Sequence, residues 1–289
     1  MKAIRMNKKD DPDDVSLTDG HCIFLEDSKY LTYISMVKDS PEVRNVYVMG
    51  FYRLSLMFLV EQKSNCTRLK AVEMQNRTKF KNAVVTGIVG ANDTRHFLYI
   101  STVDLQKGER RVLTFFGASF ELTEALRFAN SDYALACALE DVKRLPWIVI
   151  SYDIECNHCV NRVKRFAEHF PELLDVVQRI KGCIPKAHLR NHKDDCQYRY
   201  SFNYTDGVGR TCGEGIEIGW VEENQTSGST KEMNAGRRHD TLDDFNNYYN
   251  WEKVIKCRSS ISLIQFTFGS KAQFQLVFCF AFTPTIYLC

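Results

Sequence analysis

The chain has 289 residues, 44% of them hydrophobic and 26% charged, a composition typical of a globular protein with one large core or two small ones. Lys and Arg total 38 against 36 Asp and Glu, so the net charge of +2 excludes a chain-wide basic field, and nucleic acid would need a local patch. The eleven cysteines accompany a first segment without an apolar signal-peptide core, which favours reduced thiols in an intracellular compartment.

The first half of the chain predicts a hairpin, a helix and a strand after a polar, turn-rich start. Residues 83–91 and 96–103 are apolar and β-branched on either side of a turn, which predicts the hairpin. Ser131-Asp132 is expected to cap a helix that ends at Val142. Pro146 then separates this helix from an apolar strand over 147–152.

The second half predicts mostly helices. Apolar residues at helical spacing between Val160 and Phe170 predict one helix, and Pro171 is expected to open another that stops before Gly182. A further helix is expected near Gly215. Trp220 and Trp251 are expected to be core anchors, because large aromatic side chains are mostly packing residues.

Carboxylates in two remote segments predict a metal site. Glu214 and Glu217 lie three residues apart in a glycine-rich run, and on a helix both side chains would share one face, where they could bind one divalent cation. Asp153 follows the strand 147–152, at the sheet edge where α/β sites assemble. The alternative is that Asp153 is a turn residue and that the glutamates favour a helix dipole.

Three long segments of the chain resemble the transposase core of the Kyakuja-Dileera-Zisupton (KDZ) elements of fungi. They are SYDIECN (151–157), IPKAHLRNHKDDCQYRYSFNYTDGVGRTCGEGIEIGW (184–220) and STKEMNAGRRHDTLDDFNNYYNW (229–251). Shorter stretches at 11–17 and 79–89 also resemble this family. The resemblance implies an α/β fold: a ribonuclease-H-like core with insertions and a loop-rich helical C-terminal part.

The same resemblance implies the organisation of the chain. Residues 1–46 are expected to be an N-terminal polar segment of the transposase core, and 61–256 the ribonuclease-H-like core itself. Apolar runs at 47–60 and 110–128 interrupt matching sequence and resemble translated intron, so the chain is expected to be a truncated or mis-spliced fragment. The hydrophobic tail 257–289 is expected to lie outside the fold. Polar residues interrupt it, whereas a membrane span needs about 20 nearly unbroken apolar residues, so no membrane is expected as a partner.

The activity implied by the resemblance is DNA strand cleavage and transfer in the nucleus, with an Asp-Asp-Glu triad that holds two Mg²⁺ or Mn²⁺ ions. Asp153 would be the second acid and Glu217 the third, with Glu214 as the alternative. The first acid of the family belongs upstream of the segment 10–17, where the chain begins with Met1–Arg5. The four aspartates at positions 10, 11, 13 and 14 are expected to be turn residues. The chain alone is therefore expected to be inactive.

A second pattern combines thiols and imidazoles. Cys156 and Cys159 precede His188, His192 and Cys196 in a C-x2-C-x28-H-x3-H-x3-C order, and such residues can hold Zn²⁺ tetrahedrally. The family pattern retains all of these except Cys159, so the preferred zinc ligands are Cys156, His188, His192 and Cys196. The alternatives are inert buried thiols with core histidines, and a thioredoxin-like redox pair of Cys156 and Cys159.

Basic residues predict a local DNA patch. The residues expected to contact phosphates are Arg162, Lys164, Arg165, Lys186, Arg190, Arg237 and Arg238. Such a patch binds DNA, including transposon ends, in a salt-sensitive way with little base preference. The alternatives are a solvated helix face and pairing with nearby acids. The transposase fragment could form a homo-oligomer. The alternatives for the whole chain are a non-catalytic DNA- or protein-binding relict domain and a zinc-stabilised structural module.

Overall fold

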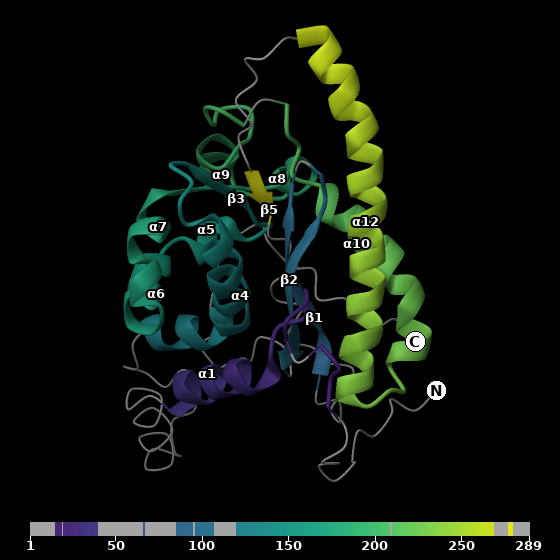
Figure 1. Ribbon diagram of the computed structural model, residues 1–289. Helices are drawn as coiled ribbons and strands as arrows, with labels where there is room; N and C mark the ends of the chain where they lie inside the picture. The colour runs from purple at the N-terminus through teal and green to yellow at the C-terminus, as the bar shows by residue number, and fades with distance from the viewer. Residues whose placement is uncertain are drawn as a thin grey trace.

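The structure of the protein is a computed structural model that describes residues 15–18, 20–39, 66, 85–94, 96–106, 120–208, 210–268 and 277–279. The aspartates at positions 10–14 and the insert expected at 47–60 lie outside the described residues, and so does the insert expected at 110–128 up to position 119. The described elements form a mixed α/β fold around a five-stranded sheet, as the sequence predicts at the level of class (Figure 1).

The predicted hairpin is confirmed. Strands β1 (Val85–Asp93) and β2 (Tyr99–Gln106) pair antiparallel. Their side chains alternate between the two faces of the sheet: Ile88 packs with one buried cluster and Val89 with the other. In the connecting turn, Asp93 Oδ2 accepts the main-chain N–H of His96 at 2.9 Å. The hairpin therefore forms one side of the sheet.

The other side of the sheet is parallel. Strand β3 (Ile148–Ser151), which the sequence predicts, pairs parallel with β4 (Ile180–Cys183). Gly182 lies in β4, and the helix that precedes this strand ends at Arg179, so the prediction that it stops before Gly182 is confirmed. Strand β5 (Val277–Cys279) lies between the two sides, antiparallel to β1 and parallel to β3, in the order β2-β1-β5-β3-β4. Part of the tail that was expected outside the fold thus occupies the centre of the sheet.

Helix α4 (Phe120–Val142) is longer than the sequence predicts. The expected cap, Ser131-Asp132, lies inside it, and both side chains are buried. Phe128 falls within the insert expected at 110–128, yet its side chain is fully buried in the main core cluster. Helix α1 (Asp27–Asp39) packs against α4 through Tyr30, whose ring lies 5.1 Å from that of Tyr133.

Short helices connect β3 to β4: α5 (Glu155–His158), α6 (Arg162–His169), the 3-10 turn η1 (Pro171–Leu173) and α7 (Leu174–Arg179). The two helices predicted on either side of Pro171 are confirmed in α6 and α7. Phe166 of α6 is fully buried, as the helical spacing requires, whereas Val160 and Val163 are exposed. Helices α8 (Lys186–Leu189) and α9 (Asp194–Arg199) follow β4.

The last helices cover the face of the sheet that lies opposite to α4. These are α10 (Gly215–Glu223), η2 (Asn224–Thr226), α11 (Ser227–Thr230) and the long α12 (Ala235–Phe268), which runs beside α10 in Figure 1. The predicted start near Gly215 is confirmed. Trp220 is buried with Tyr99 and Tyr249, as expected, but Trp251 is 62% exposed, so its expected role as a core anchor is wrong. No helix among the described residues has the length and apolarity to cross a membrane.

Candidate functional site

Asp153 lies just beyond the carboxyl end of β3, where the parallel strands end. Tyr152 donates its main-chain N–H to the carbonyl of Cys183 at 3.0 Å, which joins this turn to the end of β4. The carboxylate of Asp153 also accepts hydrogen bonds from main-chain N–H groups, including that of Ile154. Because parallel strands direct their carboxyl ends to one edge, residues that follow β3 and β4 meet there.

The start of α10 is fixed at the same edge by contacts with the start of α8. Lys186 donates its main-chain N–H to the carbonyl of Cys212 at 3.0 Å, and Ala187 donates to Glu214 Oε1 at 2.7 Å. Gly213 has a φ of +81°, a left-handed conformation that favours glycine. These contacts bring the two glutamates to the site of Asp153.

Three side chains gather in front of Asp153. Ligand atoms of His188, Glu214 and Glu217 lie within 4.8 Å of one another, and His188 Nε2 lies 2.5 Å from Glu217 Oε1. His188 was expected among the zinc ligands, but the structure places it with the carboxylates. The structure thus brings Glu214 and Glu217 together with His188, and the charges of His188 and Glu217 act on Asp153, which is not itself a member of this group.

The charges of His188 and Glu217 both act on Asp153. The pKa of Asp153 is raised to about 7, chiefly by burial and also by the charge of Glu217, against the opposing effects of His188 and main-chain hydrogen bonds. Burial lowers the pKa of His188, but the hydrogen bond that the imidazole donates to Glu217 and the charges of Asp153 and Glu217 outweigh it, so the net shift is upward. Carboxylates that share a buried place disfavour each other's charge, and a cation would relieve this repulsion.

Two carboxylate oxygens of the site are open to a ligand. Asp153 Oδ1 and Glu214 Oε2 are buried, and within the described ranges neither accepts a hydrogen bond. Buried polar atoms are seldom left unpaired, and where they are, one reason is that they bind an ion. With Glu217 they form a set of hard oxygen donors, which suits Mg²⁺ or Mn²⁺.

A separate cluster consists of Cys66, Cys156, His192 and Cys196. All four are buried, and their sulfur and nitrogen atoms lie within 4.8 Å of one another. This cluster could bind a metal such as zinc. It contains three of the four expected zinc ligands and replaces His188 with Cys66, which the sequence did not indicate because no motif surrounds it and it lies far from the others. Burial lowers the pKa of His192 to about 4, which keeps the imidazole neutral at pH 7.

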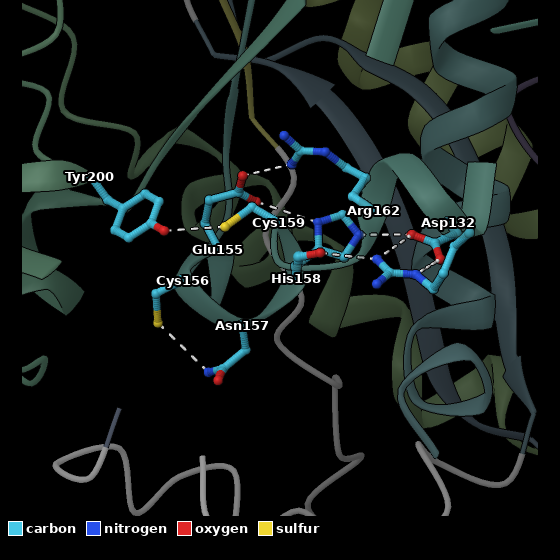
Figure 2. A network of polar contacts seen from close by, with 9 residues as sticks. Asp132, Glu155, Cys156, Asn157, His158, Cys159, Arg162 and Tyr200 are labelled. Atoms are coloured by element: carbon cyan, nitrogen blue, oxygen red, sulfur yellow. Dashed lines mark hydrogen bonds and ion pairs between the residues drawn. The ribbon is translucent and has the colours of Figure 1, made fainter. Parts of the chain in front are cut away.

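Cys159 is outside this cluster, and its Sγ lies 3.2 Å from the hydroxyl of Tyr200 (Figure 2). Burial raises the pKa of both Cys156 and Cys159. A redox-active pair requires the opposite, a thiol whose pKa is lowered. Cys156 and Cys159 are both free thiols. The geometry therefore gives no support to the thioredoxin-like alternative.

The expected DNA contacts divide into buried and exposed residues. Arg165 pairs with Asp132 at 2.5 Å. Arg162 pairs with Glu155 at 2.6 Å, and His158 lies between Glu155 and Asp132 (Figure 2). Both arginines are buried. Guanidinium groups that are paired inside the molecule are not placed to contact a phosphate backbone.

Arg238 is also buried and pairs with Asp104, which His239 contacts as well, at 2.9 Å. Asp27, Asp104 and His239 form a further group of side chains that could hold a metal ion. Arg238 already supplies a positive charge to Asp104 in this group. Lys164, Arg190 and Arg237 are exposed, and Lys186 is half-buried. Of the seven residues expected to contact phosphates, these four therefore remain available for such a contact.

The chain was compared with known proteins. The family model described as Kyakuja-Dileera-Zisupton transposase matches residues 1–250. No curated protein and no solved structure matches the chain. The family match spans most of the 289 residues and includes Asp153, Glu214, Glu217 and the Cys/His cluster. The chain belongs to the Kyakuja-Dileera-Zisupton transposase family.

Proposed function

We propose that this chain carries part of the catalytic centre of a DNA transposase of the Asp-Asp-Glu type. The observation that carries the proposal is that Asp153, from the end of β3, interacts electrostatically with Glu217, which lies beside Glu214 and His188 at the start of α10. Asp153 is the second acid and Glu217 the third, with Glu214 as the alternative. The substrate is DNA, and the place of action is the nucleus.

The fold supports this assignment. An antiparallel hairpin on one side of the sheet, a parallel pair on the other and a helix between them are compatible with a ribonuclease-H-like core. The acids lie at the carboxyl end of the parallel strands, the usual place of sites in α/β proteins.

Each residue has a role in holding the cation. Asp153 and Glu214 offer buried, unpaired oxygens, and Glu217 offers a carboxylate that His188 orients through the bond to Oε1. When bound, Mg²⁺ or Mn²⁺ supplies a Lewis acid for phosphoryl transfer on DNA. Main-chain N–H groups fix the carboxylate of Asp153 before any ligand arrives. The described residues place one aspartate at this site, so strand transfer by this chain alone is expected to be absent.

The test is Mn²⁺ binding to the full chain, followed by electron paramagnetic resonance. Asp153→Asn or Glu217→Gln is expected to weaken binding about tenfold or more, because one charged ligand is lost. Glu222→Gln is the matched control, since Glu222 lies on the same helix but is exposed. Equal Mn²⁺ affinity in the wild type and in the Asp153→Asn, Glu217→Gln double variant would overturn the proposal.

The alternative function is DNA binding without catalysis. A transposon-end duplex would then bind to the chain with the same affinity in the presence and absence of Mn²⁺, and Asp153→Asn would change nothing. Binding should weaken steeply with salt if Lys164, Arg190 and Arg237 contact phosphates.

A further inference from the structure

We propose that Cys66, Cys156, His192 and Cys196 form a closed Zn²⁺ site. The cluster connects Cys66 to α5 and to the α8–α9 region, which are remote from it in the sequence. It lies outside the carboxylate group and does not depend on transposase activity. The role we assign to this zinc ion is structural.

The spacing of the four side chains fits a tetrahedron. With Zn–S of about 2.3 Å and Zn–N of about 2.0 Å, a tetrahedral site separates nitrogen from sulfur by about 3.5 Å and sulfur from sulfur by about 3.8 Å. His192 Nδ1 lies 3.5 Å from Cys66 Sγ and 3.5 Å from Cys156 Sγ. All four ligand atoms lie within 4.8 Å of one another. Small side-chain shifts would therefore complete the coordination.

The donor set and its burial select the metal. Three thiols and one imidazole are soft or borderline ligands, which favour Zn²⁺ over Mg²⁺ or Ca²⁺. The exposed fractions are 1% for Cys66, 6% for Cys156, 1% for His192 and 2% for Cys196, so no ligand faces solvent. Four protein ligands fill a tetrahedral site, whereas a catalytic zinc ion keeps one position for water.

Further contacts orient the ligands. The main-chain N–H of Lys193 donates to Cys66 Sγ at 3.2 Å, and the side-chain amide of Asn157 donates to Cys156 Sγ at 3.6 Å (Figure 2). The ring of His192, whose Nδ1 faces the sulfurs, also forms a hydrogen bond with the main chain of Asp153. Such outer contacts stabilise thiolates and fix the imidazole at zinc sites. Through His192, the zinc ion would hold the turn that carries Asp153.

The first test uses the wild-type chain. Protein expressed with added zinc is expected to retain one zinc ion per chain by mass spectrometry. X-ray absorption at the zinc edge should show three sulfur ligands and one nitrogen ligand. Two sulfurs and two nitrogens would instead indicate the set Cys156, His188, His192 and Cys196, and would overturn the proposal. A chain that binds no zinc after titration with an equimolar amount would overturn it as well.

The second test uses single variants. Cys66→Ser is expected to lose the zinc ion or to bind it at least ten times more weakly. His188→Ala should keep it, and so should Cys183→Ser, a matched control with a buried thiol that contacts Thr205 outside the cluster. Glu217→Gln should also keep zinc while losing Mn²⁺, so the failure of one proposal can be told from the failure of the other. Full zinc retention by a folded Cys66→Ser chain would contradict our assignment.

Discussion

Gly213 determines how the chain enters α10. Its φ is +81°, and an added Cβ would lie 2.6 Å from Ser151 Oγ and 2.7 Å from a ring carbon of Phe202. Phe202 is fully buried, so its ring has little room to move. The next residue is Glu214, whose carboxylate accepts the N–H of Ala187. The geometry of the acid site thus depends on a position that only glycine fits without strain.

Gly213→Ala is expected to lower the free energy of unfolding by about 1–3 kcal/mol, because a left-handed backbone and a steric clash must both be accommodated. Urea denaturation measures the change. Gly228→Ala is the control, since a Cβ there meets nothing within 4 Å, and its effect should stay within about 0.5 kcal/mol of zero. Equal effects at the two positions would contradict this account.

Glu223 is a buried carboxylic acid whose ionisation lowers the stability of the folded protein at high pH. Burial raises its pKa to about 8, and the hydroxyl of Tyr99 is its hydrogen-bond donor at 3.5 Å. The pKa in the folded state lies above the ordinary value of 4.5, so the folded state keeps the proton between pH 4.5 and about 8. The stability that this group contributes is complete below pH 4.5 and is lost as the pH rises through about 8.

Glu223→Gln should therefore raise the free energy of unfolding at high pH and leave it unchanged at low pH. We expect a gain of roughly 3 kcal/mol at pH 9 and no change near pH 4, because the amide stays neutral at both. Thermal unfolding of wild type and variant across this pH range is the measurement. A gain that does not change with pH would exclude the titration of Glu223 as its cause.

At the scale of elements, buried ion pairs join α4 to α5 and α6. Asp132 of α4 accepts from Arg165 of α6 and contacts His158 at 2.8 Å, and Glu155 contacts His158 and Arg162 (Figure 2). Burial alone would raise the pKa of Asp132, but Arg165 and His158 lower it to about 2. These helices cover one side of the sheet, so the network holds the crossover that leads from β3 to β4.

Asp132→Ala is expected to lower the free energy of unfolding by about 3–5 kcal/mol, because it leaves a buried guanidinium without its carboxylate. The control is Glu140→Ala on the same helix, which removes an exposed pair with Lys143 and should change stability by about 0.5 kcal/mol or less. Both are measured by urea denaturation. A loss of similar size in the control would show that the position on α4, rather than the buried pair, decides the effect.

At the scale of the whole molecule, β5 joins the two sides of the sheet. It is the strand between β1 and β3, and in the described part of the chain those two strands have no direct pairing with each other. Without β5, the facing edges of β1 and β3 would present unpaired N–H and C=O groups. Residues 277–279 of the hydrophobic tail therefore belong to the sheet, whereas the sequence predicts a tail outside the fold.

Removal of residues 269–289 is expected to lower the melting temperature by about 5 °C or more and to promote aggregation, because the two new strand edges can pair with other chains. Removal of residues 280–289 keeps β5 and serves as the control. Differential scanning calorimetry and light scattering measure both. If the longer deletion were neutral or improved solubility, the tail would lie outside the fold, as the sequence predicts.

The accuracy of the sequence-based predictions follows the range of the interactions involved. Periodicity predicted β1, β2, β3, α6 and the start of α10, because apolar spacing and turn residues act within a few positions. It missed β4, the first turns of α4 and the exposure of Trp251, which depend on neighbours distant in sequence. Asp153, Glu214 and Glu217 could be grouped because each lies beside a local signal, a strand end or a glycine-rich helix start.

By itself, the sequence determined the family, the α/β class and the carboxylates of the candidate site, since these are carried by local motifs. Tertiary structure alone brought Cys66 to the other thiols, paired His188 with Glu217, buried Arg162 and Arg165 in ion pairs and placed β5 in the sheet. The physical reason is that burial and pairing are properties of the packed chain. A residue's type shows which partners it can have, and only the fold decides which of them it meets.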